Sequence, residues 1–196
     1  MRQPVRLAWQ LAATLAQAGL SWFFLLYLIP LAIVRWQQRD ELSSFGIEPE
    51  RLLGMFVFGC AAAANLWSRL TLAWLGRGST IGITAPSQLV VRGPYAWLRN
   101  PVTTTTIAQG VGVFLYTGSA LLIPYLCLLA LAWHILIRPA EEHELQRRFG
   151  REYEFYRRSV RCWLPMRRRF RQRGTIPPID TTEIRLPPKR RRHRHR

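Results

Sequence analysis

Hydrophobic residues along this chain gather into four long blocks separated by short polar segments. The blocks cover about residues 7–34, 52–75, 102–116 and 120–137. A helix needs about twenty apolar residues to cross a bilayer, and only the third block is clearly shorter than that. An uncharged turn, Thr117-Gly118-Ser119, joins the third block to the fourth. The pattern predicts an all-α, polytopic membrane helical bundle with about four spans, of which the last two form a short hairpin.

Polar residues inside the first two blocks indicate how these helices pack. In the first block they recur every three or four residues, at Gln10, Thr14, Gln17 and Ser21. This spacing predicts a face that meets another helix, with placement at the membrane interface as the alternative. In the second block, Asn65 and Arg69 are interpreted as interfacial residues whose polar ends reach toward water. Small residues of the second block, among them Gly54 and Gly59, predict close helix contact.

A nine-residue segment before the third block differs in kind from the rest. It is Gly93-Pro94-Tyr95-Ala96-Trp97-Leu98-Arg99-Asn100-Pro101. Its two prolines fix their own φ angles and disfavour helix in the residues before them. Irregular backbone is costly in hydrocarbon unless protein or a ligand satisfies its polar groups. We therefore predict a rigid elbow at the membrane surface, and we take it as the first candidate for part of a binding site.

After the fourth block, apolar residues recur at helical spacing within a highly charged segment. Arg138 and Pro139 end the apolar run, and the pair Glu141-Glu142 follows. Spacings of three and four then predict the apolar face of an amphipathic helix, formed by Leu145, Phe149, Tyr153, Tyr156 and Val160. Gly150 is expected to interrupt this helix. The helix is expected to lie on the membrane or to cap the bundle, with one glutamate of the pair directed toward the elbow.

The net charge of +17 is distributed unevenly. Residues 167–196 carry twelve of the 28 Lys and Arg against two acidic residues, and this composition predicts a disordered basic tail. The amino end and the segment around the elbow carry arginine without acid, whereas residues 35–51 balance the two. Because positive charge favours the cytoplasmic side, both termini and the elbow are expected to be cytoplasmic. Three regions are expected. Residues 1–75 form a two-helix membrane part, residues 76–166 form a core with the elbow, the hairpin and the carboxyl-terminal helix, and residues 167–196 form the basic tail.

Several signals admit a simpler interpretation. Glu141 and Glu142 also suit an ordinary helix start, because carboxylates stabilise the first turn. No H-E-x-x-H spacing joins the histidines and glutamates, and the three cysteines are far apart, so no metal site is predicted. Gly76-Arg77-Gly78 lacks the strand and the third glycine of a dinucleotide-binding motif, and we interpret it as a loop.

The ordered set of motifs resembles the isoprenylcysteine carboxyl methyltransferase and phospholipid methyltransferase superfamily. The set consists of Pro86-x-x-Leu89-Val90-Val91-Arg92, the elbow, the helical hairpin, Glu141-Glu142, Phe149-Gly150-x-x-Tyr153-x-x-Tyr156, Val160 and Trp163-x-Pro165. It covers about residues 76–166. The run Val102-Thr103-Thr104-Thr105-Thr106 departs from the pattern, because family members commonly have a glycine where this chain has Thr105.

This resemblance implies an integral-membrane methyltransferase that uses S-adenosylmethionine and acts on a lipid or isoprenoid-type acceptor with a carboxylate or amine. It implies a cofactor site without a Rossmann domain, made by the elbow, the hairpin and the carboxyl-terminal helices. The matching cofactor-site residues are Gly93, Tyr95, Arg99, Asn100, Pro101, Glu141, Glu142, Tyr153 and Tyr156. Arg138 and Glu142 are the candidates for catalysis and positioning. Core packing is the alternative role for the two tyrosines of the carboxyl-terminal helix.

Expected partners are the lipid bilayer, a lipophilic acceptor, and anionic lipid headgroups at the basic tail. No nucleic acid is expected, because the tail has no interleaved aromatic residues for base stacking. Two other functions stay open. One is an NADPH-dependent membrane reductase, since sterol reductases resemble this family in their carboxyl-terminal half. The other is a non-catalytic membrane scaffold with a recruiting tail. The Glu141-Glu142 pair followed by Phe149-Gly150 favours methyl transfer.

Overall fold

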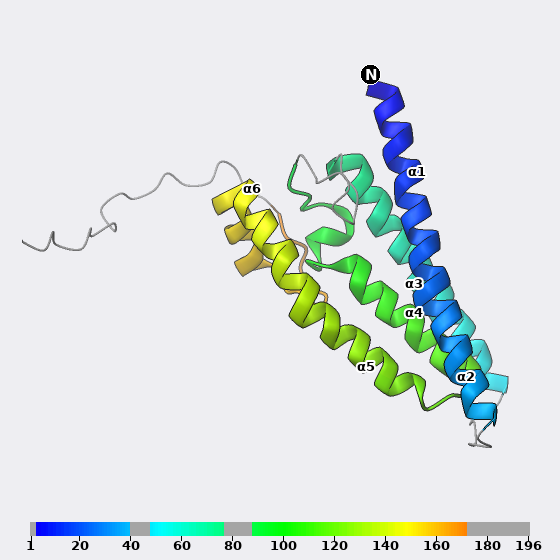
Figure 1. Ribbon diagram of the computed structural model, residues 1–196. Helices are drawn as coiled ribbons and strands as arrows, with labels where there is room; N and C mark the ends of the chain where they lie inside the picture. Colours follow the sequence, from blue (N-terminus) through cyan, green and yellow to red (C-terminus); the bar gives the residue numbers. More distant parts are fainter. Residues whose placement is uncertain (1–2, 40–47, 77–87, 172–196) are drawn as a thin grey trace, which may run out of the picture.

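The computed structural model describes residues 3–39, 48–76 and 88–171, and every regular element within these ranges is helical (Figure 1). The elements are α1 (Gln3–Ser21), η1 (Trp22–Leu28), α2 (Ile29–Arg39), α3 (Glu48–Gly76), η2 (Gly93–Ala96), α4 (Pro101–Thr117), α5 (Leu122–Ala132), η3 (Trp133–Ile137) and α6 (Arg138–Ser159). The prediction of an all-α fold is confirmed. The predicted loop around Gly76-Arg77-Gly78 and most of the predicted basic tail lie outside the described residues.

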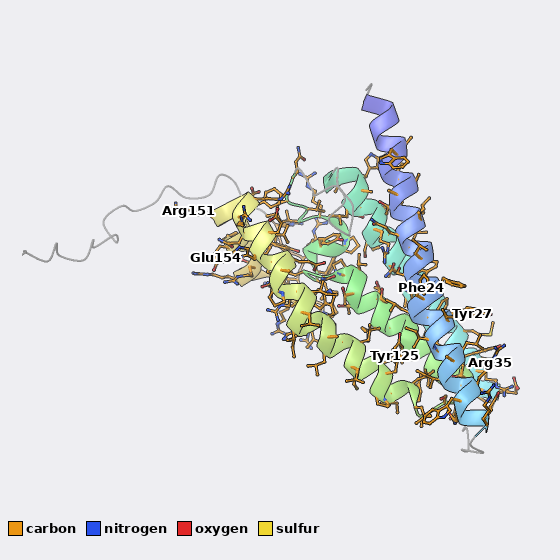
Figure 2. All side chains as sticks on the ribbon, in the orientation of Figure 1. Phe24, Tyr27, Arg35, Tyr125, Arg151 and Glu154 are labelled. Atoms are coloured by element: carbon orange, nitrogen blue, oxygen red, sulfur yellow. The ribbon has the colours of Figure 1, made fainter. Side chains whose placement is uncertain are left out.

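Three helices of the described ranges are long and apolar enough to cross a membrane, namely Leu11–Arg39, Glu48–Gly76 and Leu122–Ser159. Large hydrophobic side chains point outward from them; Phe24 and Tyr27, for example, are about half exposed on the outer face of the first (Figure 2). Exposed apolar surface of this extent suits contact with lipid. The short third span, α4, has 17 residues and a length of about 26 Å, so its crossing of the membrane stays a prediction.

The helices form an antiparallel arrangement with two distinct ends (Figure 1). α1 begins at the end of the bundle where α3 finishes, and the elbow and α6 lie toward that same end. α4 and α5 make the expected hairpin, and Gly118 ends α4 in the left-handed conformation with a φ of 65°. The elbow and the start of α1 therefore share one side of the bundle, while the assignment of that side to the cytoplasm stays a prediction.

Close backbone contact holds α3 against α4. A Cβ atom on Gly54 would lie 2.6 Å from the backbone nitrogen of Tyr116, and one on Gly112 would lie 2.8 Å from that of Phe58. These distances are below any real Cβ contact, so both positions require glycine. The expectation for Gly54 is confirmed. The expectation for Gly59 is wrong, because a Cβ there would meet nothing within 4 Å: this glycine lies on a different face of α3.

Two π-helical segments stand directly before prolines. η1 ends two residues before Pro30, and η3 ends two residues before Pro139. Proline has no backbone N–H to donate, and its ring crowds the preceding turn of the helix. A local π turn accommodates the missing hydrogen bond and the crowding. The Tyr125 hydroxyl of α5 donates to the Leu25 carbonyl at 2.9 Å and so joins α5 to η1. Pro139 ends the apolar run as predicted, but the helix continues through it into α6.

The apolar face of the amphipathic helix α6 packs on the chain before the elbow and on the chain that follows the helix. Tyr153, Tyr156 and Val160 form a buried cluster with Val91, and partly buried Met166 and Phe170 pack on it. Both placements expected from the sequence, on the membrane and as a cap on the bundle, stay predictions. Gly150 interrupts α6 with a φ of 50° and a ψ of −118°, as predicted.

The interior between α1, α3 and α4 is polar. Thr14 and Gln17 of α1 are buried, and Ser21 accepts a hydrogen bond from Arg69, which confirms that this face meets another helix. The interpretation of Asn65 and Arg69 as residues that reach toward water is wrong. Asn65 is fully buried and Arg69 is 4% exposed. Both lie on the buried stripe that runs from Ala61 to Ala73 at four-residue spacing, so their side chains enter the bundle.

Candidate functional site

The elbow begins with a glycine that the backbone requires. Gly93 has a φ of 59°, and a Cβ atom there would also lie 3.2 Å from the Cγ2 atom of Thr71 on α3. Pro94 then starts the short η2 helix, and its carbonyl accepts hydrogen bonds from the backbone of Trp97 and Leu98. Gly93 and Pro94 thus turn the chain tightly against the end of α3, as the predicted rigid elbow requires.

Asn100 and Pro101 start α4 in the manner that their residue types favour. The Asn100 side-chain oxygen accepts from the backbone nitrogen of Thr103 at 3.2 Å, which makes Asn100 the N-cap. Pro101 takes the first helical position, where a missing N–H costs nothing. The cap leaves the amide nitrogen of Asn100 free to donate elsewhere, and it donates to Glu141 at 3.4 Å.

Backbone hydrogen bonds fasten the elbow to the chain that follows α6. Arg99 donates its backbone N–H to the Arg161 carbonyl at 2.9 Å, Met166 donates to Trp97 at 3.0 Å, and Phe170 donates to Ala96 at 2.7 Å. From α6 itself, the Tyr156 hydroxyl donates to the Tyr95 carbonyl at 2.8 Å. The irregular backbone therefore finds its partners within the protein, which is the condition for such a segment at membrane depth.

Glu142 is the centre of an ion cluster that joins the elbow to α6. One of its oxygens lies 3.0 Å from Nη1 of Arg99 and 2.9 Å from Nε of Arg138, and the other lies 3.8 Å from Arg157. The Arg99 and Glu142 side chains are only 13% and 16% exposed, so solvent screens their attraction weakly. One carboxylate thus positions two arginines from different parts of the chain. The expectation that a glutamate of the pair is directed toward the elbow agrees with this geometry.

Glu141 lies beside the same cluster but is much less engaged. Within the described ranges its carboxylate makes a single hydrogen bond, the long one from Asn100. Burial raises the pKa of the neighbouring Tyr95 hydroxyl well above its ordinary value, while the positive charge of Arg69 opposes this and the negative charge of Glu141 adds to it. Glu141 therefore keeps acceptor capacity for a ligand and shares its surroundings with Tyr95.

Arg138 is held from a second side by aromatic residues. Its Nη1 atom lies 3.2–3.3 Å from the ring nitrogens of His134, one turn earlier. Trp163 donates its indole N–H to His134 at 3.1 Å and packs edge-on against Trp133. Arg138 is therefore placed by a layer of rings that the sequence analysis did not identify. In the sequence, the spacing of four residues between His134 and Arg138 was the signal that could have indicated this contact.

Tyr153 and Tyr156 lie behind the cluster in the apolar core. Both are almost fully buried, and their contacts are with the elbow: Tyr156 bonds Tyr95, and Tyr153 bonds the guanidinium of Arg99. These contacts support the packing role that was the alternative for the two tyrosines. A direct part in holding a cofactor stays a prediction.

The residue set suits a zwitterionic, hydroxyl-bearing ligand. Arg99 and Arg138 can bind a carboxylate, and the remaining acceptor capacity of the Glu141 carboxylate can take an amino group or ribose hydroxyls. Arg99 also has a buried Nε–H that makes no hydrogen bond, and a buried unpaired donor is costly unless a ligand uses it. The site thus fits the amino acid and ribose groups of S-adenosylmethionine.

Sequence reasoning missed Asn65 and Arg69, which lie just inside the elbow. Asn65 donates to the Val102 carbonyl at 2.9 Å and to the Thr105 hydroxyl at 2.9 Å, and it accepts from Nε of Arg69 at 2.8 Å. The sequence shows that these two residues are four positions apart, but it does not show which face of α3 packs against other helices. Thr105, the departure from the family pattern, has its hydroxyl in this network.

Comparison with known protein families identifies the relationship that the geometry suggests. The model of the phospholipid methyltransferase family matches residues 49–152, more than half of the 196-residue chain. The chain belongs to the phospholipid methyltransferase family. No curated protein and no solved structure matches it. The matched region includes α3, the elbow, Arg138 and the Glu141-Glu142 pair, and it ends before Tyr153. Membership of this family indicates a membrane methyltransferase and confirms the resemblance found from the motifs.

Proposed function

We propose that this protein transfers a methyl group from S-adenosylmethionine to an amine or carboxylate on a lipid or isoprenoid-type acceptor. The observation that carries the proposal is the convergence of Arg99 and Asn100 on Glu142 and Glu141, inside the region that matches the family. The alternative of a nicotinamide-dependent reductase has less support, because the matched family is one of methyltransferases. The scaffold alternative leaves this convergence without a purpose.

When bound, S-adenosylmethionine supplies an electrophilic methyl group on a positively charged sulfur. Methyl transfer mostly requires that donor and acceptor are aligned and that water is excluded. Arg99 and Arg138 would hold the donor carboxylate, and Glu142 keeps both guanidinium groups in place. Glu141 would accept hydrogen bonds from the donor's amino group or ribose. An acceptor carboxylate needs no base, which fits a site that is rich in positioning groups.

The site lies where a water-soluble donor and a membrane-bound acceptor can meet. The elbow stands at the end of the membrane helices, and α6 extends from the same end of the bundle (Figure 1). A lipophilic acceptor would enter between helices from the bilayer. We propose that this end faces the cytoplasm, which accessibility labelling of single-cysteine variants from either side of sealed vesicles can measure.

Equilibrium binding of S-adenosylhomocysteine to the purified protein in non-ionic detergent tests the donor site. We expect saturable binding that weakens at least tenfold in Glu142→Ala. Asn100→Ser is the sharper variant, since serine keeps the helix cap but removes the amide that reaches Glu141; we expect weaker binding with unchanged helicity. Glu144→Ala, which removes an exposed ion pair with Arg148, is the matched control.

Retention of NADPH in place of S-adenosylhomocysteine would overturn the proposal in favour of a reductase. Normal cellular function of a protein with both Glu141 and Glu142 substituted, together with loss of function on deletion of the tail, would favour the scaffold. The acceptor class can be found by lipid analysis of cells with and without the protein, fed a methyl-labelled donor precursor. The proposal expects a labelled lipid that disappears in Glu142→Ala.

A further inference from the structure

Arg69 is a positive charge inside the helical bundle with no negative partner in the part of the chain that the structure describes. Its side chain enters the space between α1, α3 and α4 and is 4% exposed. Within residues 3–39, 48–76 and 88–171, no carboxylate lies within 4 Å of its guanidinium group. An unpaired charge in such surroundings is unfavourable, because it loses its hydration without gaining a counter-charge. A protein keeps a residue of this kind at membrane depth chiefly where it has a functional role.

The guanidinium group of Arg69 is held rigidly but is only partly used. Its Nε donates to Asn65 at 2.8 Å, and its Nη2 donates to the Ser21 hydroxyl at 3.0 Å. Nη1 is buried and makes no hydrogen bond. Arginine has five N–H donors, so three remain, all on the two terminal nitrogens. Donors on terminal guanidinium nitrogens bind carboxylate and phosphate oxygens by charge-assisted hydrogen bonds.

Arg69 lies next to the candidate donor site. Asn65, which fixes it, bonds the Val102 carbonyl in the first turn of α4, directly after Asn100 and Pro101. The Tyr95 hydroxyl of the elbow is within electrostatic range of both Arg69 and Glu141. The cation is thus on the bundle side of the elbow, whereas Arg99 and Arg138 are on the α6 side.

We propose that Arg69, oriented by Asn65 and Ser21, binds an oxyanion carried by one of the two reactants of the site. The oxyanion is either the phosphate diester of a lipid acceptor or the carboxylate of the methyl donor. In the second case Arg69 takes over the carboxylate that the function proposed above gives to Arg99 and Arg138. The identity of the reactants rests on the function proposed above, whereas the presence of an oxyanion subsite rests on Arg69 itself.

Four soluble probes separate the two sources, because they form two matched pairs. Glycerophosphoethanolamine carries the phosphate diester that ethanolamine lacks, and S-adenosylhomocysteine carries the carboxylate that methylthioadenosine lacks. Affinities are measured by thermal shift on the full chain in non-ionic detergent, where no lipid phosphate competes. We expect Arg69→Gln to weaken binding of one of the two oxyanion-bearing probes at least tenfold and to leave binding of its counterpart without the oxyanion unchanged.

Two further variants keep the test decisive. Arg69→Lys retains the charge but not the guanidinium donors, so we expect its affinity for the oxyanion-bearing probe to fall by less than that of Arg69→Gln. Arg69→Lys also replaces Arg69→Gln in the test if the latter does not fold. Arg35→Gln removes an exposed arginine on the outer face of α2 (Figure 2) and is expected to bind all probes as the unchanged protein does. If the Arg69 variants bind glycerophosphoethanolamine more weakly, the oxyanion is the acceptor phosphate. If they bind S-adenosylhomocysteine more weakly, it is the donor carboxylate.

The inference and the proposed function fail in different ways. If Arg69→Lys and every folded Arg69 variant bind all four probes as the unchanged protein does, the oxyanion subsite is overturned while donor binding stands. If the unchanged protein binds glycerophosphoethanolamine through Arg69 but does not bind S-adenosylhomocysteine, the subsite stands and the methyltransferase proposal fails.

Discussion

Arg69 is buried and Arg99 is largely buried; both lie close to the start of α4, and their surroundings are opposite. Arg99 shares the carboxylate of Glu142 with Arg138 and bonds Tyr153, so its charge is compensated within the protein. Among the described residues, the hydrogen-bond partners of Arg69 are neutral, namely Asn65 and Ser21. A compensated cluster remains assembled without a ligand, whereas an uncompensated cation gains most when an anion arrives. The first arrangement suits a scaffold for the donor, and the second suits capture of an oxyanion.

The largest expected effect on stability comes from removing the shared carboxylate. Glu142→Ala leaves Arg99 largely buried without a counter-charge, so we expect the free energy of unfolding to fall by about 3 kcal/mol. Thermal unfolding in non-ionic detergent measures it. Glu144→Ala, on the exposed face of α6, should leave the unfolding temperature unchanged. Equal effects of the two variants would show that Glu142 does not compensate Arg99.

The second effect tests the contact that brings the Arg69 region against α4. Gly54→Ala forces a methyl group into the backbone of α4, and we expect a loss of about 2–3 kcal/mol because the helices must separate. Gly59→Ala is the matched control on the same helix, where a methyl group meets nothing, and it is expected to be neutral or slightly stabilising. A neutral Gly54→Ala would contradict the close packing of α3 on α4.

The third effect sharpens the difference between the two arginines directly. Asn65→Ala removes the acceptor of Arg69 Nε and the donor to α4, and we expect a loss of about 2 kcal/mol. Addition of the oxyanion probe that binds Arg69 should restore part of the lost stability. Ser68→Ala, which loses only a bond to the Ala64 carbonyl within α3, should cost clearly less. A similar loss for both would mean that Asn65 does not support Arg69.

The smallest effect concerns the departure from the family pattern. Thr105→Val removes one hydroxyl from the Asn65 network but keeps the shape, and Asn65 retains the Val102 carbonyl and the Thr106 hydroxyl. We expect a loss of about 1 kcal/mol or less and unchanged binding of S-adenosylhomocysteine. A large loss of donor binding in Thr105→Val, measured beside Thr104→Val, would place Thr105 in the donor site.

Local signals accounted for much of the candidate site. Asn100-Pro101 is a helix start by residue type alone, Gly150 breaks a helix by lacking a side chain, and the apolar stripe from Leu145 to Val160 gives the packed face of α6. These features depend on neighbours within a few residues, so the sequence contains them. The pairing of Arg99 with Glu142 could be suspected from charge, but its geometry needed the folded elbow.

The sequence by itself determined the helical blocks, the elbow and the acidic start of α6, because periodicity, proline and charge act over one or two helical turns. Only the tertiary structure decided which face of α3 is buried. That decision depends on Gly54 and Gly112, which meet across 58 residues of sequence, and on the contact of α1 with α3 through Ser21 and Arg69. It made Asn65 and Arg69 interior residues rather than interfacial ones, since a helix in a bilayer can present a polar face to protein or to water, and its own sequence favours both alike.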